Sequence, residues 1–320
     1  MPQVGTVLAL FSIVMLKQNT IGKTVECSGI GLHSGKRVHL TLKPAPDNTG
    51  IVFRRIDLNY FPIKADVTHA SKLSYATNLT RNGVSIATTE HLLGTIIGMG
   101  IDNLYIDIDA EEVPIMDGSA SAFVYLISEA GLQKGDAERR YLKIVRPVHF
   151  GSGDRRASVY PSEDYRITYS IQFDHPVVGN QERTIVVRDA ETFRSEIASA
   201  RTFGFLKDVE MLRKNGLAMG GSLDNAIVID SDRVLNSHLR YPDEFVRHKI
   251  LDVIGDMGLL GYALVGHIVA HKAGHEIHAG LARKIRENPA SFEIVPASEL
   301  VPEHVAASHV EQEVVSPALG

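Results

Sequence analysis

A short internal repeat is the feature that most constrains the fold of this chain. Residues 91–98 read HLLGTIIG and residues 248–255 read HKILDVIG, so both segments place His, Ile and Gly at matching positions. Each segment has the pattern of a helix and is followed by a predicted strand and a further helix. The repeat therefore predicts an α+β fold with two similar domains. Each would be a two-layer sandwich of helices packed on a sheet.

The repeat also has a chemical consequence, because it contains one histidine in each half. If the domains pack together through these helices, His91 and His248 face each other across the interface. Interfaces between domains are common places for small-molecule sites. The sequence therefore predicts an active site between the two domains, next to both imidazoles.

Periodic segments elsewhere agree with an α+β fold. Alternation of apolar and polar residues predicts strands over 37–42, 103–109 and 165–173, and a further strand is predicted over 265–270. Helical periodicity and turn signals predict helices over 88–99, 119–130, 190–200, 208–214, 244–260 and 274–287.

These elements define the expected boundaries of the domains. We expect the first α+β domain over residues 17–140 and the second over 141–295. The apolar segment 4–16 is too short for an ordinary membrane-spanning helix. We interpret residues 1–16 as a non-core N-terminal extension, with a membrane-surface anchor as the alternative. Residues 296–320 lack a clear period, and we expect them to form a mobile tail.

Charge and cysteine content exclude several classes of function. The chain has 33 basic and 38 acidic residues, so it lacks the basic footprint of a nucleic-acid-binding protein. Cys27 is the only cysteine, which excludes an internal disulfide and any multi-cysteine metal site within one chain. A metal site must therefore combine some of the 14 histidines with Asp or Glu, a donor set typical of catalysis. The single cysteine fits a cytoplasmic compartment.

One predicted helix, over 244–260, carries a line of possible metal ligands. His248, Asp252 and Asp256 are four residues apart and therefore lie on one helix face. A histidine and an aspartate at this spacing can both reach one cation at roughly 2.0–2.2 Å. Asp256 could then orient a neighbouring histidine. The alternative is an ordinary solvated face, since such polar pairs are common.

The pair Glu90 and His91 begins another predicted helix. Adjacent helical residues point about 100° apart, so one can bind a metal while the other takes a proton from a nearby water. A capped helix with an acidic first turn is the alternative.

Two further segments are candidates for a site. We expect Gly274 to open a helix with His275 exposed at its N-terminus. A carboxylate such as Asp256 would favour the charged imidazole, which could stabilise an oxyanion or protonate a leaving amine. A surface histidine is the alternative. Residues 29–35, GIGLHSG, form a glycine-rich loop that suits a close approach to a ligand but lacks the ending of a P-loop.

Six short segments follow one another between about residues 17 and 286. They are GIGLHSG at 29–35, TEH at 89–91, PIMDGS at 114–119, ARTFGF at 200–205, FVRHKILD at 245–252 and KAGH at 272–275. In this order they resemble the family of zinc-dependent UDP-3-O-acyl-N-acetylglucosamine deacetylases of lipid A biosynthesis. The resemblance implies two α+β domains joined face to face, which agrees with the repeat.

The resemblance implies roles for individual residues. The implied Zn²⁺ ligands are His91, His248 and Asp252, and iron(II) or cobalt(II) could substitute for zinc. The implied catalytic residues are Glu90 as general base, His275 as electrostatic catalyst and general acid, Asp256 as its partner, and Thr202 as support for the carbonyl oxygen.

The resemblance also implies contacts with the substrate. Residues that match the family's sugar, nucleotide and phosphate contacts are His33, Phe203, Asp208 and Lys249. An insert, residues 204–230, matches the family's passage for an acyl chain. Its apolar candidates are Leu217, Ala218, Met219, Ala226 and Val228, with ordinary core as the alternative. The segment Ser71–Leu79 matches the family less clearly.

The activity that the resemblance implies is hydrolysis of the N-acetyl group of UDP-3-O-(3-hydroxyacyl)-N-acetylglucosamine. The products are acetate and UDP-3-O-acyl-glucosamine, in the committed step of lipid A biosynthesis in a Gram-negative bacterium. The alternatives are a zinc amidase acting on another acylated amino sugar and a non-catalytic nucleotide-sugar binding protein. We expect a cytoplasmic monomer with no nucleic-acid partner and at most peripheral contact with the inner membrane.

Overall fold

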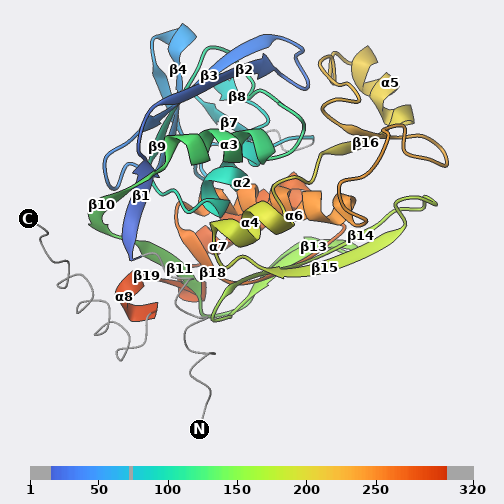
Figure 1. Cartoon of the computed structure of the whole chain (residues 1–320). Helices are drawn as coiled ribbons and strands as arrows, with labels where there is room; N and C mark the ends of the chain where they lie inside the picture. The colour runs from blue at the N-terminus through green and yellow to red at the C-terminus, as the bar shows by residue number, and fades with distance from the viewer. Residues whose placement is uncertain (1–15, 72–74, 301–320) are drawn as a thin grey trace, which may run out of the picture.

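Helices form the middle of the molecule, with a β-sheet on either side of them (Figure 1). The computed structural model describes residues 16–71 and 75–300. The expected mobile tail beyond residue 300 and all but Leu16 of the expected N-terminal extension lie outside these residues. The mixed α+β architecture predicted from the sequence is confirmed.

The first sheet is built from residues of the N-terminal half. Its strand order is β2 (Val25–Ile30), β3 (Arg37–Pro44), β9 (Leu104–Ile108), β4 (Ile51–Arg55) and β5 (Phe61–Lys64). The alternation in β3 buries Val38, Leu40 and Leu42 on the inner face, where α2 (Glu90–Gly98) and α3 (Ser121–Ala130) lie (Figure 1). Smaller sheets pair β6 (Ala70–Ser71), β7 (Asn78–Arg81) and β8 (Val84–Ile86), and join β1 (Lys17–Ile21) to β10 (Leu132–Glu138).

The second sheet is organised around one long strand, β18 (Ala263–His271). It pairs in parallel with β11 (Arg140–Ile144) and β14 (Tyr165–Gln172), and antiparallel with β13 (Arg155–Tyr160). The outer strands are β12 (Val148–Ser152), β15 (Asn180–Val186) and β19 (Phe292–Pro296). The helices α4 (Ala190–Glu196), α6 (Glu244–Met257) and α7 (His275–Glu287) belong to this half. Strand β18 leads directly into α7, which fixes where that helix begins.

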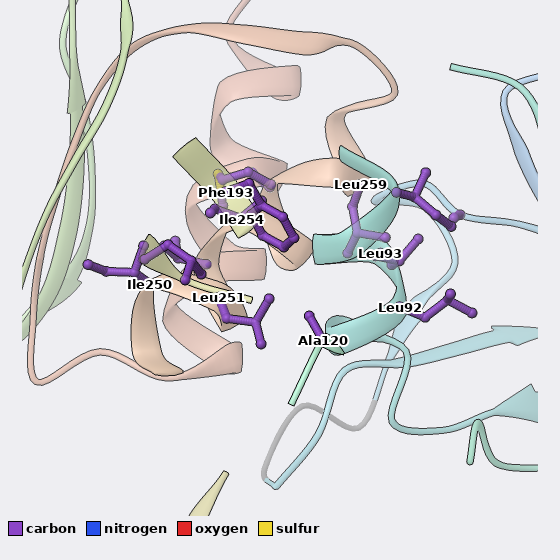
Figure 2. Packing of buried hydrophobic residues seen from close by; sticks show 14 of the residues in the cluster. Leu92, Leu93, Ala120, Phe193, Ile250, Leu251, Ile254 and Leu259 are labelled. Carbon is purple, nitrogen blue, oxygen red and sulfur yellow. The ribbon is translucent and has the colours of Figure 1, made fainter. Parts of the chain in front are cut away.

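The two halves meet where α2 packs against α6. Leu93 of α2 and Leu251 and Ile254 of α6 are buried near this contact, whereas Leu92 and Ile250 are buried on the sides of the two helices that point away from it (Figure 2).

Glycines let the two backbones approach closely. A Cβ at Gly94 would lie 2.8 Å from Cδ1 of Leu251, and one at Gly255 would lie 2.1 Å from the carbonyl oxygen of Glu90. The start of α2 is therefore held against the body of α6.

The insert stands to one side of this sandwich (Figure 1). Strands β16 (Phe203–Phe205) and β17 (Ile227–Ile229) pair in parallel, and α5 (Leu206–Lys214) lies between them in the sequence. No side chain of α5 is buried. The insert is therefore a small appendage beside the helix interface rather than part of either large sheet.

The C-terminal boundary differs from the prediction. The chain stays structured past residue 296, through α8 (Ala297–Leu300), so the tail does not begin at 296. The physical reason is pairing of β19 with β11, which buries Val295 and Ala297. Among the described residues, no helix combines the length and the apolar character that a membrane crossing requires. The division into domains at residues 140 and 141 stays a prediction.

Candidate active site

The crossing of α2 and α6 brings three possible metal ligands together. His91 comes from α2, and His248 and Asp252 come from successive turns of α6. Their ligand atoms all lie within 4.8 Å of one another, and all three residues are buried. The two imidazole rings meet edge to face with their centroids 4.8 Å apart. The structure therefore brings together the three residues that the sequence marks as ligands.

The surroundings of Asp252 fit a bound cation. Its Oδ1 lies 3.3 Å from Nε2 of His248 and 3.7 Å from Nε2 of His91. Among the described residues, this buried oxygen has no hydrogen-bond partner, which is costly unless a cation binds there. Its Oδ2 accepts a hydrogen bond from Nζ of Lys249 at 2.7 Å.

The protonation states of these side chains also suit a metal. Burial lowers the pKa of His91 to about 3 and lowers that of His248, so both imidazoles are neutral and able to coordinate. Burial would raise the pKa of Asp252, but the positive charges of Lys249 and His275 hold it well below its usual value. Two neutral imidazoles and one carboxylate therefore form a donor set that fits a divalent cation.

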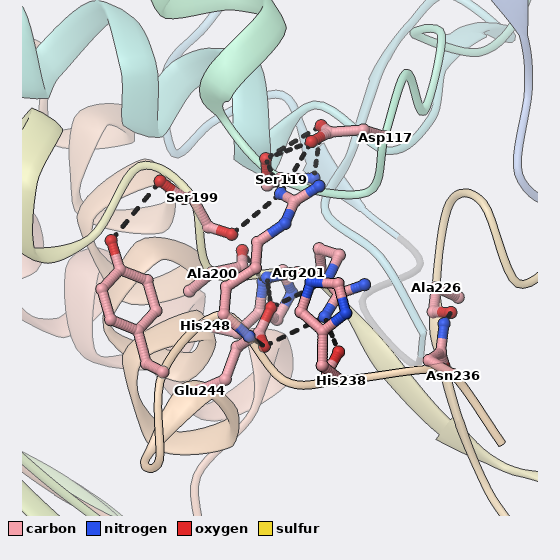
Figure 3. Close-up of polar contacts among 12 residues, drawn as sticks. Asp117, Ser119, Ser199, Ala200, Arg201, Ala226, Asn236, His238, Glu244 and His248 are labelled. Carbon is pink, nitrogen blue, oxygen red and sulfur yellow. Dashed lines mark hydrogen bonds and ion pairs between the residues drawn. The ribbon is translucent and has the colours of Figure 1, made fainter. Parts of the chain in front are cut away.

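The orientation of His248 is fixed from behind. Its Nδ1 donates to the carbonyl oxygen of Ala200 at 3.0 Å (Figure 3). This contact directs Nε2 toward Asp252. The next residue, Arg201, is clamped to the first turn of α6. The backbone N–H of Arg201 donates to Oε1 of the fully buried Glu244 at 3.0 Å, and Nε of Arg201 donates to the same oxygen at 2.9 Å. This clamp was not predicted from the sequence.

Glu90, the first residue of α2, lies beside the ligand cluster. Its Oε2 accepts a hydrogen bond from the backbone N–H of Thr77 at 2.9 Å, and its Oε1 lies 3.8 Å from Nε2 of His275. Burial raises the pKa of Glu90 to about 7, which places this carboxyl in the range of a general base near neutral pH. Thr88, two residues earlier, has φ 57°, a strained left-handed conformation for a β-branched residue.

His275 begins α7 as predicted, but it is buried rather than exposed at a rim. The reason is that the N-terminus of α7 packs against α6, where Asp256 accepts a hydrogen bond from Nδ1 of His275 at 2.9 Å. Burial alone would lower the pKa of His275. The carboxylates of Asp256, Glu90 and Asp252 outweigh this effect and raise it to about 9.

Two residues of this site were missed by the sequence reasoning. Thr77 is fully buried and donates from its hydroxyl to Asp256 Oδ1, while its backbone holds Glu90. His278 donates from Nδ1 to Oδ2 of Asp256 at 2.8 Å. The spacing of three between His275 and His278 on one helix could have revealed the second histidine. Thr77 carries no local signal and lies in the segment that matched the family less clearly.

A second group of possible ligands, Asp256, His275 and His278, lies next to the first. Here both Nδ1 atoms already donate to the same carboxylate oxygen of Asp256. Hydrogen bonds within the protein therefore satisfy this group, whereas Oδ1 of Asp252 has no hydrogen-bond partner in the part of the chain that the structure describes. The donor atoms of the first cluster therefore fit a metal ion better than those of the second.

Comparison with known families agrees with this geometry. The family described as UDP-3-O-acyl N-acetylglycosamine deacetylase matches residues 18–287, most of the chain. The chain belongs to this deacetylase family.

Individual members of the deacetylase family are similar along nearly their whole length. A UDP-3-O-acyl-N-acetylglucosamine deacetylase of Acidithiobacillus ferrooxidans is 47% identical over 288 residues, which cover 89% of this chain and 95% of the relative. Proteins of the same name from Hahella chejuensis and Pseudomonas entomophila are 46% identical over 284 residues. That overlap covers 88% of this chain and 94% of each relative.

Two residues that the sequence predicts as substrate contacts lie beside the ligand cluster. The ring of Phe203 packs edge to face on Phe245 at 5.0 Å and lies 6.4 Å from the ring of His248. Nζ of Lys249 lies 5.5 Å above the ring of Phe203. Thr202 is half-buried next to them and is held by its backbone N–H, which donates to the carbonyl oxygen of Gly118 at 2.8 Å.

The remaining substrate candidates lie in and around the insert. Asp208 is in the first turn of α5, and His33 is in the glycine-rich loop, which touches the insert. Of the apolar candidates, Ala218 is buried and Met219 is 56% exposed, whereas Leu217, Ala226 and Val228 are half-buried. The insert therefore presents partly exposed apolar side chains rather than a closed core.

Proposed function

We propose that this chain is a zinc-dependent deacetylase of UDP-3-O-(3-hydroxyacyl)-N-acetylglucosamine. Water would cleave the bond between the acetyl carbonyl and the amide nitrogen, and acetate and a free amine would leave. One observation carries the proposal: Oδ1 of Asp252, which has no hydrogen-bond partner among residues 16–71 and 75–300, faces two neutral imidazoles, with Glu90 and His275 beside them. Family membership over residues 18–287 supports the choice of substrate.

His91, His248 and Asp252 would hold the metal. A divalent cation held by these residues would supply Lewis acidity, which polarises a carbonyl group and makes a nearby water molecule more acidic. Two imidazoles and one carboxylate are a zinc-type catalytic set, and iron(II) or cobalt(II) would fit the same donors.

Glu90 would act as the general base. The backbone N–H of Thr77 holds Oε2, so that Oε1 lies on the side of His275 and the ligand cluster. Its raised pKa makes the carboxylate basic enough to take a proton from the attacking water near neutral pH.

His275 would stabilise the developing negative charge and protonate the leaving amine. Asp256 holds Nδ1, and Nε2 is directed toward Glu90 and Asp252. Because its pKa is raised to about 9, the imidazole carries a proton at neutral pH, and Nε2 can pass it to the amide nitrogen as the bond to the carbonyl carbon breaks.

Other residues would position the substrate. In this proposal Thr202 supports the carbonyl oxygen, Lys249 and Phe203 contact the sugar, and His33 contacts phosphate. Asp208 lies toward the nucleotide. The apolar side chains that would follow the acyl chain are Leu217, Ala218, Met219, Ala226 and Val228. Cytoplasmic location, a monomeric state and peripheral contact with the inner membrane remain predictions from the sequence.

The test is deacetylation of the UDP-linked substrate by purified protein as isolated, after chelation and after zinc is restored. We expect turnover that is lost on chelation and recovered with zinc. Glu90→Gln should lower kcat by about 10²-fold or more with zinc content unchanged, because only the base is removed. Absence of turnover in zinc-loaded protein would refute the proposal. Equal turnover of an acylated amino sugar without UDP would favour a different amidase.

A further inference from the structure

A buried carboxylate forms hydrogen bonds both to the glycine-rich loop, residues 29–35, and to the segment just before α2. Glu112 is 3% exposed and lies between β9 and α3. Its Oε1 accepts from the backbone N–H of His33 at 2.8 Å and from the hydroxyl of Thr88 at 3.0 Å. Its Oε2 accepts from the backbone N–H of Ser34 at 2.8 Å. Three donors from two distant segments therefore converge on one side chain.

The loop is shaped to receive this carboxylate. A Cβ at Gly31 would lie 2.2 Å from Oε2 of Glu112, so only glycine lets the loop backbone approach so closely. Short bridges pair Gly31 with Pro114 and Ala87 with Glu112 on either side of the contact. The loop, the segment around Glu112 and the residues before α2 therefore form one packed unit.

The opposite side of the same loop holds the insert. The backbone N–H of Met219 donates to the carbonyl oxygen of His33 at 3.1 Å, and that of Gly220 donates to Leu32 at 3.0 Å. A Cβ at Gly220 would lie 2.2 Å from the carbonyl oxygen of Gly31. The loop is thus a connector, with Glu112 on one side and the insert on the other.

The start of α2 does not depend on Glu112 alone. The backbone N–H and hydroxyl of Thr89 both donate to the carbonyl oxygen of Thr77, at 3.0 and 2.9 Å, and Glu90 is held by the N–H of Thr77. The peptide groups of His33 and Ser34 instead converge on Glu112. Loss of this carboxylate should therefore disturb the loop more than the catalytic base.

We propose that Glu112 is a positioning residue for substrate binding. It fixes the glycine-rich loop, and through this loop it sets the placement of His33 and of the insert relative to the metal cluster. The inference rests on the proposed function, in which the loop and the insert contact the substrate. It assigns no contact with the substrate to Glu112 itself.

Glu112→Gln is the sharpest substitution, because it keeps the size of the side chain. The two backbone N–H groups bind different oxygens of the carboxylate. Whichever way the amide lies, its NH₂ group faces one N–H donor, so one hydrogen bond becomes a repulsive contact. The matched control is Glu111→Gln, which removes the same charge from the adjacent, exposed side chain that pairs with Lys36.

Two measurements test the inference. For Glu112→Gln we expect KM for the UDP-linked substrate to rise at least about tenfold, with kcat within about threefold of wild type. Hydrogen exchange of a peptide covering residues 29–36 should become faster, whereas exchange around Thr77 and Thr89 should not change. Glu111→Gln should match wild type in both measurements.

Several outcomes would overturn the inference. They are an unchanged KM, a loss of kcat at constant KM, or unchanged exchange over residues 29–36. If Glu112→Gln does not fold, Glu112→Asp takes its place. The shorter carboxylate cannot reach both N–H groups, so KM and loop exchange should again rise. A wild type without turnover would refute the proposed function instead, and the exchange measurement would still decide whether Glu112 orders the loop.

Discussion

Asp256 lies directly behind His275, with its Oδ2 2.9 Å from Nδ1 of the imidazole. Although burial disfavours the charged imidazole, Asp256, Glu90 and Asp252 together raise its pKa to about 9. The proton on His275 is therefore retained through neutral pH and lost only as the pH approaches that value. His278 shares the same carboxylate oxygen and also borders the pair.

Asp256→Asn should move the alkaline limb of the pH–rate profile to lower pH. Removing the carboxylate charge lowers the pKa of His275, so the protonated, active form disappears earlier as pH rises. We expect a shift of about one pH unit or more in the alkaline limb of kcat/KM. An alkaline limb that stays in place, with the variant folded, would argue against His275 as the protonated group.

Asp252→Ala should abolish tight zinc binding. The substitution removes the carboxylate whose Oδ1 lacks a partner among the described residues and leaves two imidazoles as ligands. Metal content after zinc loading and dialysis against metal-free buffer, measured by elemental analysis, should fall from about one zinc per chain in the wild type to near zero in the variant. His278→Gln is the control, because this histidine belongs to the hydrogen-bonded group. Retention of zinc by Asp252→Ala and its loss from His278→Gln would show that the metal binds the second group instead.

Gly255→Ala should weaken both stability and turnover. The added methyl group would lie 2.1 Å from the carbonyl oxygen of Glu90, so α2 and α6 must separate. Overpacking of this kind lowers the free energy of unfolding by about 1–3 kcal/mol, and here it also displaces the catalytic base. Thermal unfolding and turnover measure the two effects. The control is Gly204→Ala, because a Cβ at Gly204 would have no neighbouring atom within 4 Å, and its unfolding temperature should equal that of the wild type. Equal stability of the two variants would contradict the close crossing.

Cys27 should react slowly with alkylating reagents at pH 8. Burial raises the pKa of this thiol to about 11, so the reactive thiolate is scarce below that pH. Relative to a free thiol of pKa about 8.5, we expect iodoacetamide to react on the order of a hundredfold more slowly. The alkylation rate should keep increasing with pH beyond pH 9. After denaturation it should equal the rate of a free thiol. Rapid labelling of the folded protein at pH 8 would show that the thiol is not shielded.

The sequence predicted those parts of the site that depend on spacing along one helix. His248, Asp252 and Asp256 follow the helical period, so their common face can be derived from the sequence alone. The internal repeat also predicted that His91 would meet His248, and the ring centroids lie 4.8 Å apart.

Contacts between distant segments could not be derived in this way. The carbonyl oxygen of Ala200 that orients His248, and the backbone N–H of Thr77 that holds Glu90, depend on how loops fold over the helices. Neither residue type indicates such a role. The burial of His275 was missed for the same reason, since it results from packing of α7 on α6 rather than from the local sequence.

Because the site forms where α2 crosses α6, the proposed activity requires that both halves of the chain are folded and packed together. The N-terminal half contributes His91 and Glu90, and the C-terminal half contributes His248, Asp252 and His275. A chain with only one half folded would hold at most two of the three ligands and would never pair the base with the acid. An incompletely folded chain would therefore not hydrolyse the proposed substrate, and activity would begin only when both halves have packed together.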